Sequence, residues 1–230
     1  MLGWRASWVL IATILSAPAA RLCADSFGAP RPRIFSSESG TYGFKVLEPK
    51  LGESSRGVLF TLAPDGQETV IWTSKLVNLP GRVFVSEDGN RVVTVGTLGT
   101  SGHEHSVTVY TNEGKVLTDY KLEDILTEEE LRFISQSTST RAWTVHASFR
   151  FDSIVTPKQY LLTVKRFELL SAALQRLNEV PSKLRIDDPK ERERVLKENE
   201  KRIEEVQTAL KGPTERVVRI DLRTGKILAE

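Results

Sequence analysis

Cysteine is almost absent from this chain of 230 residues, because Cys23 is its only one. A single cysteine excludes an internal disulfide framework, so burial of apolar side chains must hold the fold together. The chain also carries little surplus charge, with 32 basic against 30 acidic residues. A nucleic-acid partner would require a basic surface, and this balance argues against one.

Apolar runs are short everywhere except at the N-terminus. There Arg5 precedes an uncharged run of 15 residues, 6–20, and small residues follow. This layout predicts a secretory signal peptide over residues 1–24, with cleavage after Ala24 or after Ala19. A retained membrane anchor is the alternative, although the run is shorter than the roughly 20 residues that a spanning helix needs.

Removal of residues 1–24 would take away Arg5, Arg21 and Cys23, leaving 206 residues with 30 basic and 30 acidic side chains. Lipidation of Cys23 is disfavoured because Leu22, rather than a small residue, precedes it. No other segment is long and apolar enough to span a membrane. We therefore expect an exported protein, either secreted or held in the periplasm or cell envelope.

Familiar catalytic motifs are missing as well. The nucleophile pattern G-x-S-x-G is absent, and "GTLGTSG" at 96–102 lacks the lysine of a phosphate-binding loop. No calcium loop of the form D-x-D-x-D-G occurs. Trp72 and Trp143 lie inside strand-like runs and are expected in the core rather than on a carbohydrate platform. The sequence thus predicts no catalytic residue and no cofactor.

Three histidines supply the one alternative to a non-catalytic function, namely a metal site. His103 and His105 stand two residues apart at the start of a strand-like run, where both would face the same way. Together with His146 they would give the minimum ligand set of a zinc enzyme. We favour solvated histidines at a strand end, and keep a small metal-dependent hydrolase using these three residues as the alternative.

Most of the chain has the texture of β-hairpins. Residues 25–40 are rich in Pro, Gly and Ser and are expected to be an irregular lead-in, and 41–47 a first strand. From residue 57 onward, short runs of β-branched and aromatic residues alternate with glycine-containing turns, which is typical of antiparallel hairpins. The positive φ that such turns require is predicted at Gly66, Gly89, Gly114 and Gly225.

The hairpins repeat. "VYTNEGKVL" (109–117) and "IDLRTGKIL" (220–228) share Gly, Lys, a β-branched residue and Leu at matching positions. Gly66 and Gly114 are 48 residues apart, near the length of one four-stranded propeller blade. The segments 84–98 and 106–120 together predict the four strands of such a blade.

These motifs resemble those of known repeat proteins. "VSEDGNRVVTV" resembles the strand-turn-strand of WD40-like repeats in bacterial secreted propellers. Together with the signal peptide, "YGFKV", "VTVYTNEGKVLTDYKLEDIL" and "VVRIDLRTGKIL", it resembles a family of uncharacterised secreted bacterial proteins. The resemblance covers most of 41–165 and 214–229 and implies a blade-like β domain over 41–165 and 213–230, with no known activity. There is material for about three blades, whereas closed propellers use 4–8. An incomplete ring, two packed sheets and closure by self-association all stay open.

Helices are predicted at two places. Residues 122–134 hold a capping box of Thr127 and Glu130, with Leu131 and Ile134 expected to pack on the sheet. Residues 166–212 form a helical insertion, predicted as an αα-hairpin. Its first helix is expected to end at Pro181, and its second to run about 22 residues from the Asp188 cap and Pro189 to Gly212. The apolar stripes of the two helices are Phe167, Leu170, Leu174, Leu177 and Leu196, Ile203, Val206, Leu210, with Asn199 near the seam.

The sequence therefore predicts a mainly β fold of propeller-blade-like antiparallel meander sheets with an inserted helical hairpin. The favoured function is an exported, non-catalytic binding or scaffold module of unknown ligand. In this interpretation residues 166–212 either stabilise the sheet as an αα-hairpin, which the sequence favours, or form an arm for docking a protein partner or for self-association.

Overall fold

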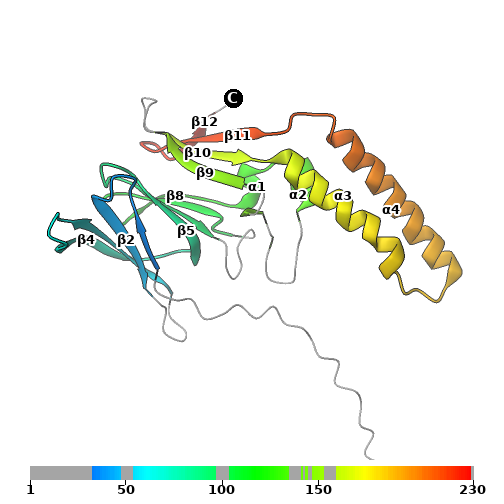
Figure 1. Cartoon of the computed structure of the whole chain (residues 1–230), viewed down its shortest axis with the longest axis horizontal. Helices are drawn as coiled ribbons and strands as arrows, with labels where there is room; N and C mark the ends of the chain where they lie inside the picture. The colour runs from blue at the N-terminus through cyan, green and yellow to red at the C-terminus, as the bar shows by residue number, and fades with distance from the viewer. Residues whose placement is uncertain are drawn as a thin grey trace, which may run out of the picture.

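The computed structural model describes residues 33–47, 54–96, 104–134, 141, 143–144, 147–152 and 159–228. The predicted signal peptide, including Cys23, lies outside the described residues. The described part is mainly β, with three four-stranded antiparallel sheets and helices that extend to one side (Figure 1). In each sheet the strands neighbour one another in chain order.

The three sheets follow one another along the chain. Sheet 1 consists of β1 (Arg33–Ser36), β2 (Tyr42–Leu47), β3 (Arg56–Leu62) and β4 (Glu68–Lys75). Sheet 2 consists of β5 (Pro80–Val85), β6 (Val92–Gly96), β7 (Val107–Tyr110) and β8 (Val116–Tyr120). Sheet 3 consists of β9 (Ala147–Asp152), β10 (Gln159–Val164), β11 (Arg216–Asp221) and β12 (Lys226–Leu228). The segments 84–98 and 106–120 thus contribute to one sheet, as expected.

Strand β1 lies inside the stretch 25–40, so the prediction of an irregular lead-in is wrong for this part. The reason is a turn that composition alone does not reveal. Residues 37–40 (S-E-S-G) fold like residues 86–89 (S-E-D-G): in both, the serine N–H donates to a carbonyl five residues on, at 2.9 and 3.0 Å. In both, the glycine N–H donates back to the serine carbonyl. The recurrence of S-E-x-G is the signal that could have placed β1.

The four predicted glycine turns all have positive φ, at +86°, +66°, +74° and +70° for Gly66, Gly89, Gly114 and Gly225. Gly66 lies in the turn between the third and fourth strands of sheet 1, and Gly114 lies in the corresponding turn of sheet 2. The 48-residue spacing in the sequence therefore reflects a repeated structural unit.

Two apolar cores lie between the sheets. Because alternate residues of a strand face opposite sides, the central sheet 2 buries both its faces, and every residue of β6 and β7 is buried. Trp72 lies in the core between sheets 1 and 2 and Trp143 in the core beside sheet 3, which confirms their predicted packing role. The first core holds Phe44, Val46, Leu59, Trp72, Leu76, Val83, Val85, Val92 and Tyr110. The second includes Val93, Val95, Val107, Val109, Tyr160, Leu162, Val218 and Ile220.

The helix predicted over 122–134 is divided into α1 (Leu122–Ile125) and α2 (Glu128–Phe133). The division falls at Thr127, whose extended backbone starts a new helix. Its hydroxyl accepts the Glu130 N–H at 3.2 Å and its N–H donates to the Glu130 carboxylate at 2.9 Å, which confirms the capping box. Ile134 is buried and Leu131 packs against the same core, as predicted.

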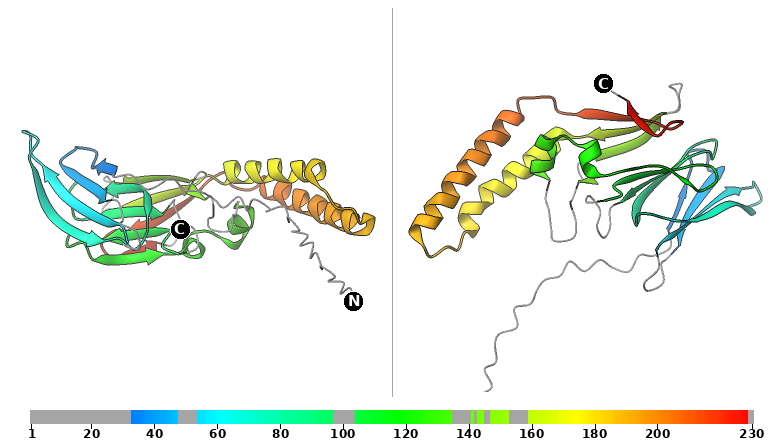
Figure 2. Two further views of the ribbon diagram at one scale, coloured as in Figure 1. Left: turned by 90° about the horizontal axis from the view of Figure 1, so that it is seen from below. Right: turned by 180° about the vertical axis from the view of Figure 1, so that it is seen from behind.

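Helices α3 (Arg166–Lys183) and α4 (Pro189–Ala209), the helical pair, lie between β10 and β11 in the chain and run side by side away from the sheets (Figures 1 and 2). Leu170, Ala173 and Val206 are buried between them. Asp188 accepts the Lys190 N–H at 2.9 Å as the predicted cap of α4. Phe167 departs from the predicted stripe, because its side chain is 54% exposed.

The prediction that Pro181 ends the first helix is wrong, since α3 continues to Lys183. Proline has no N–H, so the carbonyl of Leu177, four residues earlier, loses its helical donor. The side-chain amide of Asn199 on α4 donates to this carbonyl at 3.1 Å. Asn199 is only 6% exposed. The second helix thus supplies the hydrogen bond that the proline removes.

Candidate functional site

Of the three histidines in the metal hypothesis, the structure describes only His105; His103 and His146 lie outside the described residues. His105 precedes strand β7 and has a φ of +52°, so the strand alternation used to align it with His103 does not apply to it. Within the part of the chain that the structure describes, no cluster of three or more His, Cys, Asp or Glu residues could hold a metal ion.

His105 belongs to a hydrogen-bonded network that fixes the start of β7. Its Nδ1 contacts the Asp119 carboxylate, whose other oxygen accepts the Thr108 hydroxyl at 2.7 Å. The Asn78 side-chain amide donates to the His105 carbonyl at 3.0 Å and to the Thr108 hydroxyl at 3.3 Å. This network gives His105 a structural role in joining the β4–β5 connection to strands β7 and β8.

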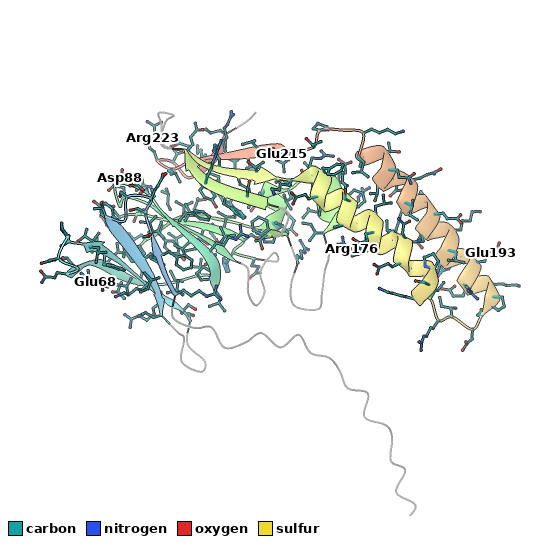
Figure 3. All side chains as sticks on the ribbon, viewed as in Figure 1. Glu68, Asp88, Arg176, Glu193, Glu215 and Arg223 are labelled. Atoms are coloured by element: carbon teal, nitrogen blue, oxygen red, sulfur yellow. The ribbon has the colours of Figure 1, made fainter. Side chains whose placement is uncertain are left out.

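A more open feature lies where the helical pair meets α2. The basal groove, as we call it, has a volume of about 380 Å³. Its floor is apolar, and three arginines and one glutamate stand around it; Arg176 is labelled on α3 in Figure 3. The lining residues are Arg132, Phe133, Ile134, Ala173, Arg176, Leu177, Arg202 and Glu205.

The three arginines come from three helices. Arg176 of α3 donates to the Phe133 carbonyl at 2.7 Å, and Arg202 of α4 donates to Glu198 at 3.0 Å. Arg132 of α2 has no acceptor among the described residues. A guanidinium carries five N–H donors, so each arginine keeps donors for a ligand. The groove therefore offers more positive than negative charge beside its apolar floor.

The wall formed by α2 is held by a buried ion pair. Glu130 is 2% exposed, and Arg216 of β11 donates to its two oxygens at 3.0 and 2.6 Å. Arg216 also donates to the Ile125 carbonyl at 2.7 Å. Burial acts to raise the pKa of Glu130, but the hydrogen bonds from Arg216 and Thr127 outweigh it and leave the pKa below its usual value. The carboxylate therefore stays charged and fixes α2 to sheet 3.

A second and larger hollow of about 960 Å³ adjoins the basal groove between α2 and the end of α4. It shares Arg132, Phe133 and Glu205 with the groove and adds Arg166, Lys201 and Lys211 among its cations. Arg166 is held by Glu129 at 2.9 Å. The two hollows together form an extended surface along α2 and α4.

The basal groove combines guanidinium groups with an apolar floor. Its lining contains no hydroxyl, thiol or imidazole side chain that could serve as a nucleophile or a neutral-pH base. Guanidinium groups bind carboxylates, often in a bidentate manner, and an apolar floor accepts an aliphatic or aromatic side chain. The arrangement fits a segment that presents an apolar residue flanked by carboxylates.

Sequence reasoning anticipated the helices that build this groove but not the groove itself. The lining residues Arg132, Arg176 and Arg202 are separated by more than twenty residues each and follow no motif. Only the packing of α2 against the helical pair brings them together.

Comparison with known proteins adds no identity. No protein-family model, curated protein or solved structure matches the chain. Among the described residues, none of the helices combines the length and apolar character needed to cross a membrane.

Proposed function

We propose that the chain is an exported, non-catalytic binding or scaffold module. In this proposal the three sheets are propeller-type blades, and α3 and α4 are an inserted helical hairpin that docks a protein partner. The signal-peptide layout of residues 1–24 supports export. The chain order of strands in each sheet and the repeated turns support blades.

The observation that carries the proposal is the basal groove at the foot of the helical pair. Arg132, Arg176 and Arg202 surround an apolar floor to which Phe133 and Leu177 contribute. Electrostatic complementarity guides partner choice and association rate. We therefore propose that the partner inserts an apolar side chain flanked by acidic residues.

The test compares two charge-reversed variants with the unmodified chain in affinity capture from the envelope fraction of the producing cell. Arg132→Glu/Arg202→Glu reverses the groove and removes one ion pair of α4, that of Arg202 with Glu198. The matched control, Lys190→Glu/Arg194→Glu, also removes one ion pair of α4, that of Arg194 with Glu191 at 2.6 Å. It lies outside the lining of the groove.

We expect the unmodified chain and the control to retain the same protein, and the groove variant to lose at least nine-tenths of it. Retention should also weaken as salt is raised, because exposed charges are screened. Equal retention by both variants, or no retained protein with the unmodified chain, would count against docking at the groove.

A further inference from the structure

The two interfaces between the sheets are built in the same way. A β-carbon added to Gly114, in the third turn of sheet 2, would lie 2.8 Å from the ring of Trp72 in β4. One added to Gly225, in the same turn of sheet 3, would lie 2.9 Å from Thr118 in β8. Each glycine turn therefore packs tightly on the fourth strand of the preceding sheet.

The contact falls at the same register position in both interfaces. Trp72 pairs with Leu59 and Thr118 pairs with Val109, and in both strands the next pair is displaced by a bulge. Between sheets 1 and 2 the first turns meet as well, because the Glu87 carboxylate in the first turn of sheet 2 accepts the backbone N–H groups of Glu38 and Ser39 in the first turn of sheet 1. The chain thus contains one type of sheet-to-sheet contact, used twice.

Sheet 1 presents the same kind of surface, with no described residue packed on its glycine turn. Gly66, which corresponds to Gly114 and Gly225, has no described atom within 4 Å of an added β-carbon. Glu38, which corresponds to Glu87, has no donor to its carboxylate among the described residues. Ile34 and Val70 on the outward face are 67% and 58% exposed. By register Ile34 corresponds to Val83, which is buried in the core between sheets 1 and 2, and Val70 corresponds to Val116, which is 45% exposed.

Sheet 3 presents the complementary surface at the other end. The row of Arg150, Leu161, Arg219 and Leu228 lies on the face of sheet 3 that is turned away from the core shared with sheet 2, and Leu161 in this row is only 5% exposed. Leu228 lies in the fourth strand of its sheet, as do Trp72 and Thr118, on which a glycine turn packs. Arg150 and Arg219 are exposed and have no acceptor among the described residues. Sheet 1 offers Glu38 and Glu68, of which Glu68 is paired with Lys45 and is labelled in Figure 3.

We propose that the outward face of sheet 1 binds sheet 3 of a second copy of this chain. The contact continues the series that already joins sheet 1 to sheet 2 and sheet 2 to sheet 3. Gly66 then packs on Leu228 of the other copy, and the carboxylates of sheet 1 meet the arginines of sheet 3. The proposal does not depend on the basal groove.

Two copies joined in this way close on themselves. A contact between unlike surfaces forms a ring when the rotation closes. Two copies of three sheets give six, which lies within the four to eight blades of closed propellers. Each copy contributes the outward faces of its sheets 1 and 3, so every such face in the dimer is in contact with the other copy. The arginines in the row of sheet 3 keep that face soluble when a copy is alone.

The first test is the mass of the exported chain in solution, measured by light scattering over a range of concentrations. We expect a dimer, and we expect Ile34→Glu to make it monomeric at every concentration tested. The matched control is Phe167→Glu, which changes a similarly exposed apolar residue on the helical pair and should leave the dimer intact. A monomeric unmodified chain, or a dimer abolished by Phe167→Glu and not by Ile34→Glu, overturns the proposal.

The second test identifies which sheets meet. Gln67→Cys, beside Gly66, and Leu228→Cys are made separately in chains that lack Cys23. After mixing and mild oxidation we expect a disulfide-linked dimer that contains one copy of each variant. Gln67→Cys should not cross-link to itself, because its two copies lie at different contacts of the ring. Self-cross-linking of Gln67→Cys, or no mixed disulfide, overturns the arrangement.

Discussion

The hydrogen bond from Asn199 to the Leu177 carbonyl predicts that two distant substitutions are coupled. In the unmodified chain Asn199→Ala removes the side-chain donor to this carbonyl, which lacks its usual helical donor because Pro181 has no N–H. Leaving a buried backbone acceptor without a donor costs about 1–3 kcal/mol. We therefore expect Asn199→Ala to lower the free energy of unfolding by about 2 kcal/mol.

The same substitution should matter much less when residue 181 can donate. Pro181→Ala restores the backbone N–H, which can then reach the Leu177 carbonyl within α3. In that background we expect Asn199→Ala to cost less than about 1 kcal/mol, so the two sites are coupled by about 1–2 kcal/mol. Pro181→Ala alone should stabilise the chain, because proline inside a helix is unfavourable by up to about 3 kcal/mol.

The assay is urea unfolding followed by far-ultraviolet circular dichroism, for the unmodified chain, both single variants and the double variant. Asn178→Ala on the exposed side of α3 is the matched control and should change stability by no more than about 0.5 kcal/mol. An equal cost of Asn199→Ala in the two backgrounds would refute the reasoning, because the amide would then not be replacing the missing N–H.

Two further predictions concern the ion pair and the turns. Glu130→Gln should lower the free energy of unfolding at pH 7 by about 3 kcal/mol, because a buried pair loses one partner. Since the pKa of Glu130 is lower in the folded than in the unfolded chain, its contribution is complete above the unfolded value of about 4.3 and is lost as the pH falls through the lower folded value. The stability difference from the unmodified chain should therefore shrink in acid, and a difference that grows in acid would contradict this. Gly114→Val should lower the melting temperature more than Gly40→Val in dilute protein, because both need a positive φ but only Gly114 packs on Trp72; equal losses would argue against that contact.

Local patterns explain why so much of the secondary structure could be predicted. Alternating apolar residues and glycine turns depend on neighbours in the chain, so the hairpin turns at Gly66 and Gly114 and the capping box of Thr127 follow from short segments. The error at β1 has the same origin, because composition hid a turn that the S-E-x-G repeat reveals. The error at Pro181 differs, because its cause lies eighteen residues away on another helix.

The sequence by itself determined the mainly β class, the positive-φ turns, the two long helices and the expectation of export. Each of these depends on residue type and on spacing within a few residues or a single repeat. Only the tertiary structure decided that Asn199 completes α3, that Glu130 fixes α2 to sheet 3, and that Arg132, Arg176 and Arg202 share one groove. These features join residues far apart in the chain, and their contacts form only when apolar burial packs the helices and sheets against one another.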